Sequence, residues 1–140
     1  MILLDTNVIS EMMRLRPNHA VVAWLDKHPI EELWTASVVL AELLTGIELM
    51  SAGRKQRALR ETVEGMIAED FRGQVLKFDL PAARSYGLIL SSRKQIGRPI
   101  REMDALIAAT AHANGATLAT RNTTNYEDCG IRLVNPWEAD

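Results

Sequence analysis

The chain has 140 residues, of which 24% are charged and 47% are hydrophobic, and its formal net charge is -2. These values suit one globular domain over residues 1–140 and exclude disordered, fibrous and membrane-embedded classes. Because the net charge is slightly negative, any nucleic-acid binding must come from a local group of basic side chains. No apolar run approaches the about 20 residues that span a bilayer. The single cysteine excludes an internal disulfide, so we expect a soluble cytoplasmic protein.

Short apolar runs and longer amphipathic stretches alternate along the chain. Such runs suit strands buried on both faces, and the stretches between them suit helices. The alternation predicts an α/β fold, a three-layer sandwich around a mostly parallel sheet, with a projecting helical hairpin at residues 38–71. Expected strands cover residues 1–4, 33–36, 75–78, 117–120 and 131–134, and expected helices cover 6–14, a segment after Pro17, 38–50, 54–71, 80–94 and 102–114.

Residues that start and stop helices fit these boundaries. Thr6 or Asn7 is expected to cap the first helix with its side-chain oxygen, and Ser37 to cap the helix after the second strand. Gly53 is expected to close that helix, and Gly115 to end the helix before the fourth strand in left-handed backbone.

Two carboxylates stand out early in the chain. Asp5 directly follows the first strand, where the end of a parallel strand opens onto a binding crevice. Glu42 lies between Val38 and Leu49 on its helix, so we expect that helix to be covered on both sides. An ionised carboxylate with apolar flanks is costly unless it is paired, hydrogen-bonded or bound to a metal. The alternative for Glu42 alone is a rim side chain that faces water.

A third carboxylate, Asp104, opens the helix over residues 102–114. It shares a face with Ile107 and Ala108, which suits close packing. The alternative is that Asp104 offsets the positive end of the helix dipole, although Glu102 is also available for that role.

Asp5, Glu42 and Asp104 should converge, because strand ends and the helical turns after them line one edge of a parallel sheet. Three acids without bases would repel and raise one another's pKa values unless a hard cation held them. Carboxylate oxygens suit Mg²⁺ or Mn²⁺, and such a cation binds a phosphodiester and supplies a water for in-line attack. The predicted chemistry is therefore metal-assisted phosphodiester hydrolysis.

Five motifs occur in order along nearly the whole chain. They are Met-Ile-Leu-Leu-Asp-Thr-Asn-Val-Ile-Ser at residues 1–10, Ser37 with Ala-Glu-Leu at 41–43 and Gly46, Asp104 with Ile-Ala-Ala-Thr-Ala at 107–111, Thr-Arg-Asn at 120–122 and Asn-Pro-Trp at 135–137. Together they resemble the PIN-domain ribonucleases, most closely the VapC and FitB branch of bacterial toxins. The resemblance implies a Mg²⁺- or Mn²⁺-dependent endoribonuclease that acts as the toxin of a type II toxin-antitoxin pair.

The same resemblance implies roles for individual residues. It implies a metal site of Asp5, Glu42 and Asp104, with polar support from Thr6, Ser37 and Thr120. Many relatives carry a fourth acid in the Thr-Arg-x segment, where this chain has Asn122. Asn122 can still offer its carbonyl oxygen in the catalytic site, but it brings no charge, which argues against a second metal. Asn125, Glu127 and Asp128 are the alternative donors in that loop.

The basic residues divide into two groups. Arg98 and Arg101 are expected to contact RNA phosphates beside Asp104. The strip over residues 54–60 is expected to be a solvated face, with Arg57 paired to Glu61. The three tryptophans, Trp24, Trp34 and Trp137, are expected to pack in the core and not to stack on bases.

The resemblance also implies an antitoxin partner of the VapB or FitA type. Such a partner sends a C-terminal segment into the toxin's groove, often with a basic side chain aimed at the acids. We expect the antitoxin to contact the hairpin at 38–71. The hairpin or the neighbouring helices could also carry a homodimer interface. DNA would be contacted only by the antitoxin. Two alternatives stay open: a catalytically weak module that binds RNA or antitoxin, and a phosphatase with Asp5 as nucleophile, in which Asn7 replaces the usual second acid.

Overall fold

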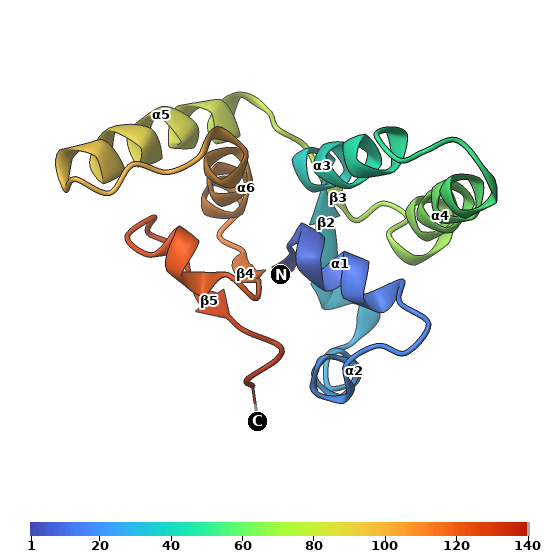
Figure 1. The fold of residues 1–140 in the computed structure, drawn as a ribbon. Helices are drawn as coiled ribbons and strands as arrows, with labels where there is room; N and C mark the ends of the chain where they lie inside the picture. The colour runs from blue at the N-terminus through green and yellow to red at the C-terminus, as the bar shows by residue number, and fades with distance from the viewer. Residues whose placement is uncertain (140) are drawn as a thin grey trace.

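A parallel sheet forms the centre of the structure, a computed structural model that describes residues 1–139 (Figure 1). The sheet has five strands in the order β3-β2-β1-β4-β5, and all four neighbouring pairs are parallel. The N-terminal strand is therefore the central one. The strands are β1 (Ile2–Leu4), β2 (Leu33–Ala36), β3 (Val75–Leu76), β4 (Thr117–Ala119) and β5 (Leu133–Val134).

Helices flank this sheet in two groups (Figure 1). The chain runs outward from β1 through β2 to β3, then crosses back to β4 on the other side of β1. The order therefore changes direction between β1 and β4, which is where open parallel sheets bind ligands. The helices are α1 (Thr6–Met12), α2 (His19–Asp26), α3 (Ser37–Glu48), α4 (Arg54–Gly65), α5 (Leu80–Gln95) and α6 (Glu102–Ala113), with short turns η1 (Ile30–Glu32), η2 (Met66–Asp70) and η3 (Thr123–Tyr126).

The hydrophobic core surrounds β1. Leu3 and Leu4 are completely buried, as are Val8 of α1, Ile107 of α6 and Leu118 of β4. An apolar run with no polar alternation can only be satisfied by cover on both faces of a sheet. The predicted α/β sandwich with a parallel sheet and its order of elements are confirmed.

Three predicted helix boundaries were wrong. Asp5 caps α1, because its Oδ1 accepts the Thr6 backbone N–H at 2.8 Å and leaves no need for a cap from Thr6 or Asn7. Ser37 is the first residue of α3 and not its cap. Gly53 does not close α3 but precedes α4, with a φ of 157° that an L side chain rarely adopts. Gly115, with a φ of 61°, does end α6 as predicted.

The hairpin of α3 and α4 also differs in detail from expectation. Leu49, predicted to be covered, is 82% exposed, so the second side of α3 is open at its C-terminal end. Arg60 pairs with Glu48 across the hairpin at 2.8 Å, whereas no Arg57–Glu61 ion pair forms within residues 1–139. Within the same residues, no helix is long and apolar enough to cross a membrane.

Candidate active site

One open pocket brings the three predicted acids together. It has a volume of about 490 Å³, and its wall includes Asp5 at the end of β1, Glu42 of α3 and Asp104 in the first turn of α6. The pocket lies at the carboxyl end of β1, beside the change of direction between β1 and β4. The topology therefore achieves the convergence that the positions of these residues predicted.

Asp5 is the most constrained of these acids. It is 4% exposed, its Oδ2 accepts the Thr120 hydroxyl at 2.7 Å, and its Oδ1 accepts the Thr6 backbone N–H. Burial raises the pKa of Asp5 above its ordinary value, the hydrogen bonds from Thr120 and Thr6 oppose that rise, and the charges of Glu42 and Asp104 add to it. The effect of burial on Asp5 therefore outweighs that of the hydrogen bonds it accepts.

Tyr126, a residue that sequence reasoning missed, connects two of the acids. Its hydroxyl lies 3.3 Å from Oδ2 of Asp5 and 3.2 Å from Oδ1 of Asp104, and the side chain is buried. Burial and the neighbouring carboxylates raise the pKa of Tyr126 above its ordinary value, so the phenol keeps its proton. Its single proton can be donated to either carboxylate. No local spacing signals this contact, because Tyr126 sits in a loop of otherwise polar residues.

Thr120 is completely buried and contacts three residues of the pocket wall. Besides donating to Asp5, its Oγ1 accepts from the Asn7 side-chain amide at 3.4 Å and from the Asn122 backbone N–H at 3.1 Å. Asn122 lines the pocket, whereas Ser37 lies outside its wall and accepts a 3.4 Å hydrogen bond from the Phe78 backbone N–H. The structure therefore brings Thr6, Thr120 and Asn122 close to the acids. Ser37 is not close to them, and its hydroxyl instead binds the backbone just after β3.

The two arginines predicted near Asp104 occupy different places. Arg101 lines the pocket, and its Nε lies 3.3 Å from Oδ2 of Asp104. Arg98 lies outside the pocket wall, where its guanidinium pairs with Glu127 at 3.2 Å and with Asp128 at 2.9 Å. Arg101 thus lies beside Asp104 as predicted. Arg98 instead forms ion pairs with Glu127 and Asp128, the two acids considered as alternative metal donors.

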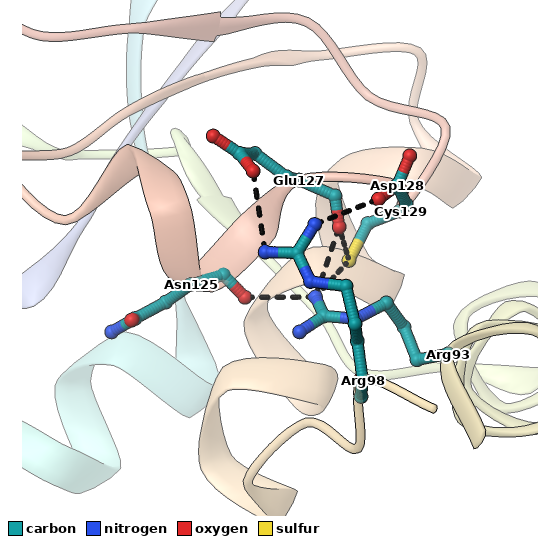
Figure 2. Close-up of polar contacts among 6 residues, drawn as sticks. All are labelled: Arg93, Arg98, Asn125, Glu127, Asp128 and Cys129. Carbon is teal, nitrogen blue, oxygen red and sulfur yellow. Dashed lines mark hydrogen bonds and ion pairs between the residues drawn. The ribbon is translucent and has the colours of Figure 1, made fainter. Parts of the chain in front are cut away.

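Buried Arg93 of α5 fastens the loop between β4 and β5 (Figure 2). Its Nε donates to the Arg98 carbonyl at 2.6 Å, and its Nη1 donates to the carbonyls of Asn125 at 3.0 Å and Glu127 at 2.9 Å. The same nitrogen lies 3.5 Å from the Cys129 sulfur, and burial raises the pKa of that thiol above its ordinary value. These contacts bracket the residue at position 126 and so fix the loop that carries the phenol.

Four further residues of the pocket wall carry charge or an aromatic ring, namely Glu11, Arg14, Arg121 and Trp137. Glu11 is 5% exposed and pairs with Arg14 at 3.2 Å. Arg14 and Arg121 are exposed cations, and Trp137 is half-buried, so it lines the pocket as well as packing against the core. Trp24 is 6% exposed and packs in the core as predicted, and Trp34 is half-buried. All three tryptophans thus pack in or against the core as predicted, and Trp137 also lines the pocket.

The donors in the pocket suit a hard divalent cation. They are carboxylate, hydroxyl and amide oxygens, the ligands that Mg²⁺ and Mn²⁺ prefer. Within residues 1–139, no three Asp, Glu, His or Cys side chains are gathered as a ready-made metal site. The three acids therefore have the right chemistry and share one wall, but their oxygens must move closer to surround an ion.

An apolar groove adjoins the pocket between α1, α3 and α4. It has a volume of about 650 Å³ and shares Glu42 and Arg14 with the pocket wall. Leu15, at one side of the groove, is 98% exposed. A large apolar side chain in that state beside other apolar residues marks a surface for a partner. The apolar residues of the groove are Met13, Leu15, Leu43, Ile47, Met50 and Leu59.

Comparison with known proteins gives consistent matches over the whole chain. The family model described as PIN domain matches residues 2–127. The VapC ribonuclease Y4jK of Sinorhizobium fredii is 43% identical over 138 residues, which is 99% of each chain. The toxin FitB of Neisseria gonorrhoeae is 43% identical over 137 residues, covering 98% of this chain and 99% of FitB. The structure of FitAB bound to an IR36 DNA fragment superposes with a TM-score of 0.91 and 41% identity, covering 100% of this chain and 98% of that one.

Proposed function

The chain belongs to the PIN-domain family, and we propose that it is a metal-dependent endoribonuclease and the toxin of a toxin-antitoxin pair. The observation that carries the proposal is the placement of Asp5, Glu42 and Asp104 on the wall of one open pocket. Carboxylates from three separate elements repel one another there unless a cation is present. The ribonuclease and toxin names of the relatives that match nearly its full length support the same function.

Asp5, Glu42 and Asp104 would hold Mg²⁺ or Mn²⁺, which supplies positive charge for the scissile phosphate and an activated water. The Thr120 hydroxyl holds one oxygen of Asp5 in a fixed direction. The Tyr126 hydroxyl, which lies within hydrogen-bond distance of Asp5 and Asp104, can donate its one proton to either carboxylate and so helps to orient the one that accepts it. The protein's own hydrogen bonds thus orient Asp5 and Asp104, two of the acids that would hold the cation.

Cations of the chain would hold the RNA backbone against this acidic site. Arg14, Arg101 and Arg121 are exposed and line the pocket. Neutralising phosphates with such side chains supplies much of the affinity of proteins for nucleic acid. We assign the phosphate role to Arg101 and not to Arg98, because Arg101 lines the pocket and Arg98 lies outside its wall. Asn122 adds a neutral oxygen and no charge, which favours a single metal.

The alternative of an Asp-nucleophile phosphatase is not favoured by the pocket. In such a site the second residue after the nucleophile supplies a carboxylic acid. Here Asn7 donates its amide to Asp5 at 3.4 Å and to Thr120 at 3.4 Å, so it orients the first acid and cannot transfer a proton. A catalytically weak binding module is separated from the proposed nuclease by the assay described next.

Removal of divalent cations is expected to abolish RNA cleavage. The purified protein, incubated with total RNA in Mg²⁺ or Mn²⁺, should cut it, and EDTA in excess should stop cleavage because the carboxylates lose the positive charge they need. Gel analysis of the RNA measures the reaction, and renewed cleavage after Mn²⁺ is added back is the control. Cleavage that continues in EDTA, or no cleavage with either metal, would contradict a metal-dependent nuclease.

We propose the apolar groove as the contact for the antitoxin. The FitAB structure holds such a pair on DNA, and we assign the contact with DNA here to the antitoxin. The groove runs directly into the pocket through Glu42. A bound segment could therefore cover the apolar wall and place a basic side chain among the acids, where a charge-assisted pair forms.

Leu15→Asp is expected to weaken binding of the cognate antitoxin by about 10- to 100-fold, because an apolar anchor is lost and a charge is desolvated. Leu49→Asp is the matched control, since Leu49 is also exposed but lies outside the groove wall. Each variant is co-expressed with the antitoxin, and the two proteins are then separated and titrated against each other in a calorimeter, which measures the affinity of each variant. Equal affinity of the two variants would place the antitoxin elsewhere.

A further inference from the structure

The closing Asn-Pro-Trp motif supplies no carboxylate to the acidic site. Its Trp137 instead pairs with Arg121, whose guanidinium carbon lies 5.1 Å from the centroid of the tryptophan ring. Both side chains line the pocket that contains the acids. We call these two residues the Arg121–Trp137 pair. It offers a cation and an aromatic surface beside the carboxylates.

Two asparagines hold the pair in place. The Asn135 side chain accepts from the Trp137 backbone N–H at 3.0 Å and donates to the Arg121 carbonyl at 3.5 Å. The Asn7 side-chain oxygen accepts from the Arg121 backbone N–H at 3.2 Å, and its amide donates to Asp5 at 3.4 Å. The backbone of the pair is thus linked through one residue to the central acid, which fixes its distance from the proposed reaction centre.

Resting on the proposed nuclease function, we propose that the Arg121–Trp137 pair is a stacking platform for one unpaired base of single-stranded RNA. Aromatic rings and guanidinium planes are the surfaces on which proteins stack splayed bases, with little dependence on base identity. A base stacked there sits beside the pocket in which its neighbouring phosphodiester meets the acids. The chain has a net charge of -2, so stacking adds affinity that charge alone does not supply.

The location of the pair favours RNA over a protein segment as its ligand. Neither Arg121 nor Trp137 belongs to the wall of the apolar groove, whereas both belong to the wall of the acidic pocket. Trp137 and Trp34 are both half-buried and packed against the core, but only Trp137 also lines the pocket. The platform also excludes a paired base, because a base within a duplex has no free face to stack.

Short single-stranded oligoribonucleotides, each lacking the base at one position, test the platform. Fluorescence anisotropy in EDTA measures their binding to the wild-type protein without cleavage. We expect the intact oligonucleotide to bind about 5- to 150-fold more tightly than the one whose missing base occupies the platform, which is the size of base–aromatic stacking. The ratio of the two affinities is taken within one protein, so it does not depend on the fraction that is folded.

Variants assign that ratio to the pair. Trp137→Ala should reduce it to about one and Trp137→Phe should keep most of it, because a phenyl ring still stacks. Arg121→Lys should lower the ratio but keep the dependence of binding on salt, since lysine keeps the charge and loses the plane. Trp34→Phe is the control and should leave the ratio unchanged, because Trp34 lies outside the pocket wall.

The outcomes separate this proposal from the one on which it rests. A ratio near one in the wild-type protein, or an unchanged ratio in Trp137→Ala, overturns the platform while metal-dependent cleavage of RNA still stands. Neither binding nor cleavage of RNA by the wild-type protein overturns both proposals. A ratio that falls in Trp137→Ala and is restored in Trp137→Phe supports the platform.

Discussion

Asp104→Asn is expected to lower the rate of metal-dependent RNA cleavage by roughly 1,000-fold, the loss of several kcal/mol of charge stabilisation at the phosphate. The substitution keeps the size of the side chain and an oxygen that can accept from Tyr126, so the fold should persist. It removes one of the three charges that would attract the cation. Initial rates on a defined RNA in Mg²⁺ and Mn²⁺, at several metal concentrations, measure the effect.

Glu102→Gln provides the matched control for this variant. Glu102 and Asp104 both lie in the first turn of α6, so each substitution removes a similar interaction with the helix dipole. Glu102 is exposed and lies outside the pocket wall, and it should therefore retain nearly full activity when changed. Asp104→Asn also breaks the ion pair with Arg101, whose side chain is exposed and can turn to water. Equal rates for the two variants would remove Asp104 from the site.

The sheet and the three acids could be predicted because each follows from a local pattern and one general rule. Apolar runs such as residues 2–4 indicate buried strands, and alternation with helices indicates a parallel sheet. That sheet brings the ends of its strands to one edge, so Asp5, Glu42 and Asp104 meet in a pocket although they are far apart in sequence. The pattern needs no knowledge of individual contacts.

Contacts made by the β4–β5 loop could not be predicted in this way. The Tyr126 hydroxyl meets residues that are 121 and 22 positions away, and only the path of the loop decides that meeting. Arg98 was expected to contact RNA because it is basic and near Asp104, but Glu127 and Asp128 lie closer to it in space. The sequence shows which charged residues could form ion pairs, whereas the path of the folded loop determines which of them meet.

Three of the predictions for helix ends, those at Thr6 or Asn7, Ser37 and Gly53, failed for a related reason. The N-cap is the residue whose side-chain oxygen is placed to accept from the free backbone N–H groups of the first turn. Several candidates often lie within two or three residues of one another. Asp5 both caps α1 and lines the pocket, a double role that the sequence motif Asp-Thr-Asn does not reveal. Ser37, a good cap by type, instead accepts from the Phe78 backbone N–H, which belongs to a distant part of the chain.

Arg93→Met is expected to lower the free energy of unfolding by about 3 kcal/mol, because buried carbonyls lose their donor. Three carbonyls, those of Arg98, Asn125 and Glu127, accept from the Arg93 guanidinium, which is 5% exposed. Methionine retains much of the packing volume, so the loss reports the hydrogen bonds. Thermal unfolding followed by circular dichroism should show a fall in melting temperature of about 10 °C.

Lys94→Met is the control, since Lys94 is the neighbouring cation on α5 and is exposed. Its melting temperature should change by about 1 °C or less, the usual result for a surface substitution. Equal melting temperatures for Lys94→Met and Arg93→Met would show that the loop holds itself without Arg93. Arg93→Lys should fall between them, because lysine keeps the charge but cannot reach three carbonyls with a planar fork.

The same loop links stability to the proposed catalysis, because Arg93 holds the residues on both sides of Tyr126. If Arg93 acts on the site through the phenol, its loss and the loss of the phenol should not add. Below its melting temperature, Arg93→Lys should therefore cleave RNA more slowly than wild type, and adding Tyr126→Phe to it should lower the rate little further. Full additivity in this double-mutant cycle would mean that Arg93 stabilises the fold without positioning Tyr126 between Asp5 and Asp104.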